Sequence, residues 1–376
     1  MRANGCRRRP VQLGGNEAMR QILFAAAIAV VVSMAVTRTL VVAFTHRRTP
    51  DRVPAGGPAP QHTGLDTPTM GGIAILAGIW AGYLCSHLAV SRLHMPGPSA
   101  TGLLVLLLAT ALGAVGLLDD CIKVRERRNL GLTGWGKAAA QIVAAAVFGY
   151  LVLRFPGTDG MTPATRHISY ARDIPTVSVG LVAFLIVVCF LVTTWTGAVA
   201  VTDGLDGLAA GTMVFALGAY VVITYWQYDK ACADMPCPGC YHVRDPLDLA
   251  LIAAAAAAAC AGFLWWNAAP ARILMGGIGS QTLGGLFAAL SITTHTELLA
   301  VVVGAVLVAE ALSVLLQVVV FRTTRSRLFK MAPFHHHFEL SKWSESTVVV
   351  RFWVMAGISA ATGLALFFGE YFGQRR

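Results

Sequence analysis

Residues 101–128 read TGLLVLLLATALGAVGLLDDCIKVRERR, and this stretch decides the fold class. Its first part, 101–118, carries no charged residue and is close to the roughly 20 residues that a helix needs to cross a hydrocarbon core about 30 Å thick. Two adjacent carboxylates and a group of basic residues follow directly. The stretch therefore predicts a membrane-spanning helix that ends in a charged segment outside the hydrocarbon core.

Apolar runs of this kind recur along nearly the whole chain of 376 residues, which is 56% hydrophobic and only 13% charged. Soluble domains are about 25% charged. Because a backbone in lipid must satisfy its own hydrogen bonds, runs of this length form helices. We expect an all-α, polytopic integral membrane protein with about ten transmembrane helices. The runs lie near 21–44, 70–90, 101–118, 137–153, 177–195, 207–226, 248–265, 274–294, 298–321 and 348–368.

The chain reads as one membrane domain. It covers 21–368, between a basic N-terminal tail at 1–20 and a C-terminal tail at 369–376. No Pro-rich, Gly-rich or Ser-rich linker separates a soluble block, and no repeat period is evident. The composition and the spans indicate an integral membrane protein that contacts lipid, with no nucleic acid among its partners.

Basic residues are distributed unevenly between the two sets of loops, and Lys and Arg are commoner on the cytoplasmic side of membrane proteins. The loops after the first, third, fifth, seventh and ninth runs contain Arg47, Arg48, Arg52, Lys123, Arg125, Arg127, Arg128, Arg272, Arg322, Arg325, Arg327, Lys330 and Lys342. The opposite set contains Arg92, Arg154, Arg166, Arg172, Lys230 and Arg244. We therefore expect the first set in the cytoplasm and both termini outside, although the N-terminal Arg2, Arg7, Arg8 and Arg9 run against this orientation.

Three cysteines lie in one loop of the exported set. Cys232, Cys237 and Cys240 can form a disulfide there, which would leave one thiol over. A zinc site with His242 is the alternative, but this spacing is a weak zinc signal, and a variable loop is the simpler interpretation. The sequence does not assign a role to each cysteine.

The dense clusters of polar residues all fall in the cytoplasmic set, which indicates one site. They are 67–72, 119–123, 202–207, 267–280 and 331–337. Asp119 and Asp120 repel each other at a helix end and need a compensating cation or metal. Oxygen-only ligands together with phosphate are typical of Mg²⁺. A solvated helix end is the alternative for the acid pair alone, and Lys123 with the other clusters argues against it.

Two further clusters add polar groups to the predicted site. The TDGLDG string at 202–207 places two carboxylates three residues apart, with glycines that let a ligand approach the backbone. His335, His336 and His337 are consecutive, so their side chains diverge and cannot easily converge on one metal ion. Donation to phosphate or sugar oxygens is the better expectation.

Taken together, the strings PTMGG, GLLDD, TDGLDGLA, FLWWNAAPARILMG and FKMAPFHHHFEL, in this order and spacing, resemble the phospho-N-acetylmuramoyl-pentapeptide transferase family. The resemblance covers residues 21–368. The uninterrupted His triplet after Met-Ala-Pro separates this family from related N-acetylhexosamine-phosphate transferases. Glu310 also matches an acid in the family's ninth helix, and acids at such depth are functional candidates.

The resemblance implies an Mg²⁺-dependent transfer of phospho-MurNAc-pentapeptide from UDP-MurNAc-pentapeptide to undecaprenyl or a related polyprenyl phosphate. The products would be lipid I, for peptidoglycan, and UMP. A phosphate monoester is mostly dianionic at pH 7, so positioning and charge neutralisation matter more than general-base help. The resemblance also implies a location in the bacterial inner membrane and allows a homodimer.

The resemblance further assigns roles to individual residues. The residues expected to be catalytic are Asp119, Asp120, Asp206, His335 and His336, with Asp119 and Asp120 also holding the metal. Those expected to bind substrate are Lys123, Lys137, Asp203, Asn267, His337 and Thr67.

Several positions depart from the family pattern. The chain reads Met275-Gly276-Gly277 where the family has Met-Gly-Asp, whose carboxylate is central to Mg²⁺ binding. Further replacements are Gly197 and Ala200 for two asparagines, Leu274 for an aromatic residue, and Gln61, Gly64 and Asp66 for His, Lys and Gly.

Two interpretations follow from these departures. Either Asp119, Asp120 or Asp206 takes over metal binding in an active transferase, or the chain is a catalytically impaired or specialised paralogue. Such a paralogue would bind lipid phosphate, a partner transferase or uridine inhibitors. A transporter is disfavoured, because only Glu310 lies as an acid deep within a run and no proline breaks a helix at midplane.

Overall fold

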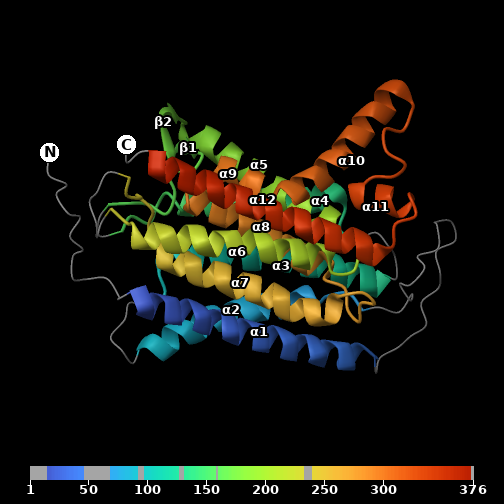
Figure 1. Cartoon of the computed structure of the whole chain (residues 1–376), viewed down its shortest axis with the longest axis horizontal. Helices are drawn as coiled ribbons and strands as arrows, with labels where there is room; N and C mark the ends of the chain where they lie inside the picture. Colours follow the sequence, from blue (N-terminus) through green and yellow to red (C-terminus); the bar gives the residue numbers. More distant parts are fainter. Residues whose placement is uncertain are drawn as a thin grey trace.

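The computed structural model describes residues 15–45, 68–91, 97–126, 131–157, 160–232 and 239–373, and within them the chain is mostly helical, as expected for a polytopic membrane protein. Long helices lie roughly side by side in one bundle (Figure 1). The helices are α1 (Gly15–Thr45), α2 (Gly72–Ser91), α3 (Ala100–Glu126), α4 (Gly134–Leu151), α5 (Leu181–Thr202), α6 (Leu208–Asp229), α7 (Pro246–Asn267), α8 (Gly276–Thr293), α9 (Glu297–Val303), α10 (Ala305–Thr324), α11 (Phe334–Glu339) and α12 (Glu345–Gly373).

Eight of the described helices are long and apolar enough to cross a membrane, so the chain is a multi-pass membrane protein. They are α1, α2, α3, α5, α6, α7, α10 and α12. The other two predicted runs also form helices, α4 and α8, of 18 residues each. In α8 every residue from Ile278 to Thr293 is buried, so its surface contacts protein rather than lipid and tolerates Ser, Thr and Gln.

The predicted single helix at 298–321 is wrong. The chain is interrupted at Gly304, between α9 and α10, and α10 leaves the bundle at an angle (Figure 1). Gly304 packs against Trp195, where an added Cβ would lie 2.8 Å from a ring carbon. Hydropathy does not reveal this change of direction, because apolar residues continue on both sides of the glycine.

The outer helices extend beyond the apolar runs. Helix α1 begins at Gly15, inside the segment assigned to the N-terminal tail, and α12 continues to Gly373, past the predicted end at 368. Each helix continues into the polar interface, where hydropathy no longer marks its end.

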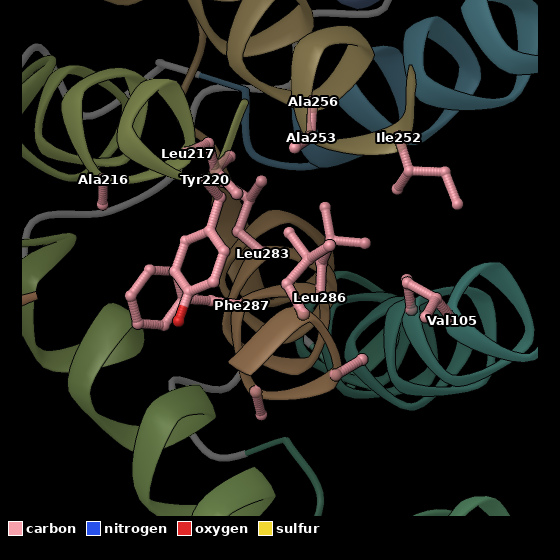
Figure 2. Packing of buried hydrophobic residues seen from close by; sticks show 14 of the residues in the cluster. Val105, Ala216, Leu217, Tyr220, Ile252, Ala253, Ala256, Leu283, Leu286 and Phe287 are labelled. Atoms are coloured by element: carbon pink, nitrogen blue, oxygen red, sulfur yellow. The ribbon is translucent and has the colours of Figure 1, made fainter. Parts of the chain in front are cut away.

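Helix α8 forms the centre of the core. Figure 2 shows Leu283, Leu286 and Phe287 of α8 among side chains of α3, α6 and α7. The Phe287 ring meets Tyr220 of α6 and Trp195 of α5 edge to face, at centroid distances of 5.2 and 4.6 Å. This packing holds α8 in place, and the N-terminus of α8 carries part of the site described below.

Small residues bring α1, α2 and α7 close together. A Cβ on Gly82 would lie 2.6 Å from the Ala25 carbonyl oxygen and 3.0 Å from the Ala255 Cβ. Helices in lipid associate through such close packing, because lipid is as apolar as leucine and provides no hydrophobic drive between them. The alanine-rich run at 253–259 serves this contact.

A two-stranded antiparallel hairpin, which the sequence did not predict, lies at the end of the bundle opposite α11 (Figure 1). It consists of β1 (His167–Ser169) and β2 (Asp173–Ser178), with His167 opposite Ser178 and Ser169 opposite Asp173. The strands are short and carry little alternation of polar and apolar residues, so the sequence gives no clear strand signal.

A disulfide, which the sequence permitted but did not assign, joins Cys232 to Cys240 at the hairpin end. Cys237 lies outside the described residues. Because the two sulfurs are bonded to each other, they cannot bind zinc as thiolates beside His242. Arg172 donates to the Cys240 carbonyl and pairs with Glu370 at 3.0 Å, which fastens the loop to α12.

Candidate active site

The predicted site residues that lie in the described regions gather at one end of the bundle. This end contains α11, the C-terminal ends of α3, α5 and α7, and the starts of α4, α6 and α8 (Figure 1). Thr67, together with Gln61, Gly64 and Asp66, lies outside the described residues. Segments far apart in sequence thus supply one polar centre.

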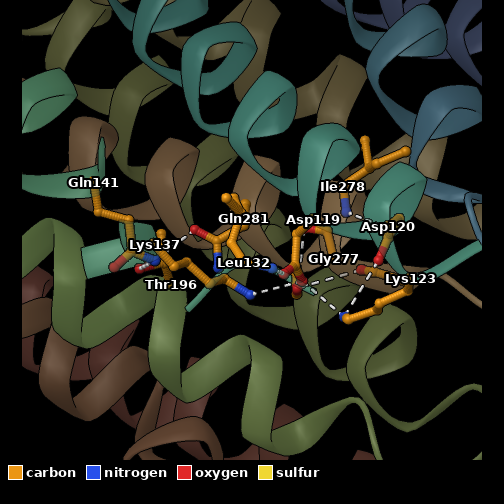
Figure 3. A network of polar contacts seen from close by, with 12 residues as sticks. Asp119, Asp120, Lys123, Leu132, Lys137, Gln141, Thr196, Gly277, Ile278 and Gln281 are labelled. Atoms are coloured by element: carbon orange, nitrogen blue, oxygen red, sulfur yellow. Dashed lines mark hydrogen bonds and ion pairs between the residues drawn. The ribbon is translucent and has the colours of Figure 1, made fainter. Parts of the chain in front are cut away.

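Asp119 is the acid that two lysines neutralise (Figure 3). Its Oδ2 lies 2.7 Å from Lys123 Nζ and 3.4 Å from Lys137 Nζ, while Oδ1 accepts a hydrogen bond from the Leu132 amide at 2.9 Å. Lys123 is one helical turn after Asp119, so the two side chains share a face of α3. Gly131 lets the following loop approach, because a Cβ there would lie 2.4 Å from Asp119 Oδ1.

Asp120 points toward the start of α8. Its Oδ2 accepts a hydrogen bond from the Ile278 amide at 3.3 Å, and its Oδ1 lies 3.6 Å from Lys123 Nζ. The N-terminus of α8 carries the positive end of the helix dipole, which favours this buried carboxylate. A Cβ on Gly276 would lie 2.7 Å from Asp120 Oδ2, and one on Gly277 would lie 3.0 Å from Oδ1. The two glycines leave a cradle beside Asp120.

Asp203 and Asp206 lie in the turn between α5 and α6 and have different environments. Burial, and then the charge of Asp120, raises the pKa of Asp203 to about 7, although the Gly276 amide donates a hydrogen bond to it. Asp206 Oδ2 instead accepts from the Ala271 amide at 2.8 Å. Asp206 therefore holds the 268–275 loop.

Asn267 also holds this loop. Its Oδ1 accepts from the Gly207 amide at 3.1 Å and its Nδ2 donates to the Ile273 carbonyl at 2.9 Å. Gly207 has a positive φ of 78°, which suits the reversal between α5 and α6 and favours glycine. The amide of Asn267 thus joins this reversal to the segment before α8.

His335 is oriented by Glu310 of α10. Both side chains are fully buried, with Nδ1 of His335 3.1 Å from Glu310 Oε2. Glu310 also accepts from the amides of Phe334 and His335 at 2.9 and 3.2 Å, so its charge is well solvated by the protein. The opposite nitrogen, His335 Nε2, is buried without a partner, and it would lie 2.3 Å from a Cβ on Gly204.

The three His side chains have different hydrogen-bond partners, although the rings of His335 and His336 lie close together, at a centroid distance of 4.2 Å. His336 Nδ1 lies 2.5 Å from Glu339 Oε2, and His337 Nδ1 accepts from the Lys330 amide at 3.2 Å. The His335 ring lies against Gly204, in the turn that carries Asp203.

Sequence reasoning missed a buried polar cluster one helical turn below the acids. Gln141 Nε2 donates to Gln281 Oε1 at 2.6 Å and to Thr196 Oγ1 at 3.2 Å (Figure 3). Gln141 and Gln281 lie four residues after Lys137 and Gly277, and this helical spacing was the available signal. The cluster connects α4, α5 and α8 beneath the site.

An apolar groove of about 530 Å³ lies between α3 and α4. Val115 lies at one end of it, one turn before Asp119, and Ala139 lies two residues after Lys137. The groove therefore leads along the two helices toward the ion pair between Asp119 and Lys137.

Comparison with known proteins identifies the family. Residues 102–295 match the family described as Glycosyl transferase family 4. A phospho-N-acetylmuramoyl-pentapeptide-transferase of Nocardia farcinica is 62% identical over 94% of this chain and 99% of its own. Proteins of the same name from Rhodococcus jostii and Mycobacterium tuberculosis are 59% and 56% identical, each over 94% of this chain and 98% of their own. The chain therefore belongs to glycosyl transferase family 4, and within it to the phospho-N-acetylmuramoyl-pentapeptide transferases.

Proposed function

We propose that this chain transfers phospho-MurNAc-pentapeptide from UDP-MurNAc-pentapeptide to a polyprenyl phosphate, giving lipid I and UMP. The observation that carries the proposal is the convergence of Lys123 and Lys137 on the buried Asp119, beside Asp120, at the end of a membrane bundle. Two ammonium groups held at the end of a membrane bundle can bind phosphate groups, and Asp119 keeps both of them in position.

The residues present fit Mg²⁺. Asp119 and Asp120 offer oxygen ligands only, which is the donor chemistry that Mg²⁺ prefers, and the cradle over Gly276 and Gly277 leaves space beside Asp120. Asp120 would hold the ion, while the neighbouring Asp119 stays paired with Lys123 and Lys137. When bound, Mg²⁺ would neutralise charge on the diphosphate and on the departing UMP.

The chain's own residues position the reactants. Lys123 and Lys137 bind the acceptor phosphate, whose oxygen attacks the β-phosphorus of the UDP-sugar while the bond from that phosphorus to UMP breaks. Because the acceptor phosphate is already mostly dianionic near pH 7, no side chain has to remove a proton. Positioning and charge neutralisation therefore account for most of the catalysis.

The two substrates reach the site from different phases. The nucleotide sugar comes from the aqueous phase and the polyprenyl phosphate from the lipid. In this proposal the nucleotide and sugar side of the site is lined by Asp203, Asn267 and His335, together with the neighbouring His336 and His337. The apolar groove between α3 and α4 gives the isoprenoid chain a route from lipid to Lys137. This end of the bundle faces the cytoplasm, where the nucleotide sugar is available, and the disulfide at the other end suits an oxidising compartment.

Gly277 supports a second candidate function, a specialised paralogue that binds lipid phosphate or uridine compounds with little turnover. No side chain at position 277 reaches Asp120, so this part of the site has one ligand fewer than an aspartate would supply.

One assay separates the two functions. The purified full chain in detergent, given UDP-MurNAc-pentapeptide and polyprenyl phosphate, should release UMP with Mg²⁺ and not with EDTA. Binding of the polyprenyl phosphate without UMP release at any Mg²⁺ concentration would reject the transferase and favour the paralogue. Chemical crosslinking of the same preparation tests the predicted homodimer.

A further inference from the structure

We propose that Asp203, from the turn between α5 and α6, is the second carboxylate that binds the divalent cation, together with Asp120 at the start of α8. The inference rests on the proposed function and refines it, because Asp203 was expected only to bind substrate. Of the two adjacent acids, Asp119 then pairs with the two lysines and Asp120 binds the metal.

The first step is that Asp120 and Asp203 face the same two-residue turn. A Cβ on Gly276 would lie 2.7 Å from Asp120 Oδ2, while the Gly276 amide donates a hydrogen bond to Asp203. The charges of the two carboxylates act on each other. They belong to α3 and to the α5–α6 turn, so the fold alone brings them together.

The second step concerns the other acids at this end, which already have different partners. Asp119 has Lys123 and Lys137 on one oxygen and the Leu132 amide on the other. Asp206 accepts a hydrogen bond from the Ala271 amide. A cation drawn to Asp119 would have to displace two ammonium groups, whereas at Asp120 the nearest ammonium nitrogen is 3.6 Å away.

The third step is the space beside Asp120. Gly276 has a φ of +73°, which a residue with a side chain rarely adopts, and Gly277 follows it without a side chain. Any larger side chain at position 276 or 277 would approach Asp120 within about a van der Waals contact. The two glycines therefore place no side chain against Asp120 at this point, which suits a small hard cation bound by carboxylate oxygens.

The fourth step is an independent sign of a ligand on the same turn. His335 Nε2 is buried without a partner and lies against Gly204, the residue after Asp203. A buried nitrogen without a hydrogen bond is energetically costly. An oxygen of a bound phosphate or of a metal-bound water beside Asp203 would satisfy it.

Manganese binding tests the inference without relying on activity. Electron paramagnetic resonance of Mn²⁺ titrated into the detergent-solubilised full chain gives the dissociation constant. Asp203→Asn and Asp120→Asn should each weaken binding by at least about 10- to 100-fold, the loss typical even of residues that only orient a metal ligand. Asp229→Asn, the same change at the far end of α6, should bind Mn²⁺ like the unaltered chain.

The outcomes separate this inference from the proposed function. Loss of Mn²⁺ binding in Asp120→Asn together with unchanged binding in Asp203→Asn would overturn the role of Asp203 and leave the transferase proposal intact. Unaltered chain that binds no Mn²⁺ but releases UMP would also overturn it. Unaltered chain that neither binds Mn²⁺ nor releases UMP would reject both.

Two further measurements keep the test decisive if Asp203→Asn fails to fold. Fe²⁺ with ascorbate and peroxide should cleave the unaltered backbone near 120, near 203 and near 276, and an absence of cuts near 203 would overturn the inference. In the Asp203→Asn background, Gly277→Asp should restore Mn²⁺ binding, because its Cβ would lie 3.0 Å from Asp120 Oδ1. Failure of a folded double variant to regain binding would contradict the shared site.

Discussion

A Cβ atom on Gly277 would lie 3.0 Å from Oδ1 of Asp120, so position 277 borders the buried carboxylate although 157 residues separate the two in sequence. This contact makes the Met275-Gly276-Gly277 segment part of the site. It also gives the departure from the family's Met-Gly-Asp motif a definite physical meaning, since a side chain here would meet Asp120 directly.

We expect Gly277→Asp to increase UMP release and to strengthen its dependence on Mg²⁺. The new carboxylate adds like charge beside Asp120, so the gain should appear only with the metal present. Ala200→Asn should increase the rate of UMP release by a factor of about 2 to 13 if its amide forms a hydrogen bond worth about 0.5–1.5 kcal/mol. The double variant should exceed each single one. An unaltered chain whose rate the double variant does not improve would contradict the impaired site.

Removal of Lys137 should lower turnover by about 10²- to 10³-fold, the usual effect of losing a group that stabilises developing charge. Lys137→Met removes the ammonium 3.4 Å from Asp119 while keeping an unbranched side chain. The assay is UMP release at saturating and limiting polyprenyl phosphate. Lys230→Met, at the far end of α6, is the control and should keep full activity. Equal rates in the two variants would remove Lys137 from the mechanism.

Gly204→Ala should impair the site through His335. The new methyl group would lie 2.3 Å from His335 Nε2, and the ring is held from behind by Glu310, so it has little freedom to move away. We expect a loss of stability of about 1–3 kcal/mol and a loss of UMP release. Gly218→Ala, which has open space around its Cβ, is the control for thermal unfolding. A fully active Gly204→Ala variant would show that the turn tolerates displacement of the His335 ring.

Glu297, at the hairpin end, should make the stability of the folded chain depend on pH. Burial, and after it the charge of Asp173, raises the pKa of Glu297 from 4.5 to about 8. The folded chain therefore holds a proton that the unfolded chain releases between these values. The stability from this group is complete below pH 4.5 and is lost as the pH rises through 8.

Thermal unfolding in detergent from pH 5 to 9 measures this contribution. Glu297→Gln cannot ionise, so its melting temperature should fall less over this range than that of the unaltered chain. Parallel curves for the two proteins would show that Glu297 is ionised in the fold.

The orientation in the membrane is tested by thiol labelling of intact cells. The background should carry serine at the cysteines outside the Cys232–Cys240 disulfide. A cysteine at Lys342 should be protected from an impermeant reagent, whereas one at Arg166 should react. The opposite result would invert the topology.

The sequence by itself determined the membrane class and the position of most helices. Apolar runs about 20 residues long have one stable backbone solution in lipid, so periodicity and tertiary contacts are not needed to recognise them. The distribution of Lys and Arg among the loops predicted that the polar clusters lie on one side of the membrane. The Asp119–Lys123 pair follows from helical spacing alone, because residues four apart share a helix face.

Only the tertiary structure decided which acid faces which partner. Lys137 of α4 pairs with Asp119, Gly276 and Gly277 at the start of α8 adjoin Asp120, and the Ala271 amide donates a hydrogen bond to Asp206. The break at Gly304 and the orientation of His335 by Glu310 are likewise invisible in hydropathy. Local sequence fixes the helix and the face on which a side chain lies, but the neighbours across that face come from helices distant in the chain, and their crossing is set by side-chain packing throughout the bundle.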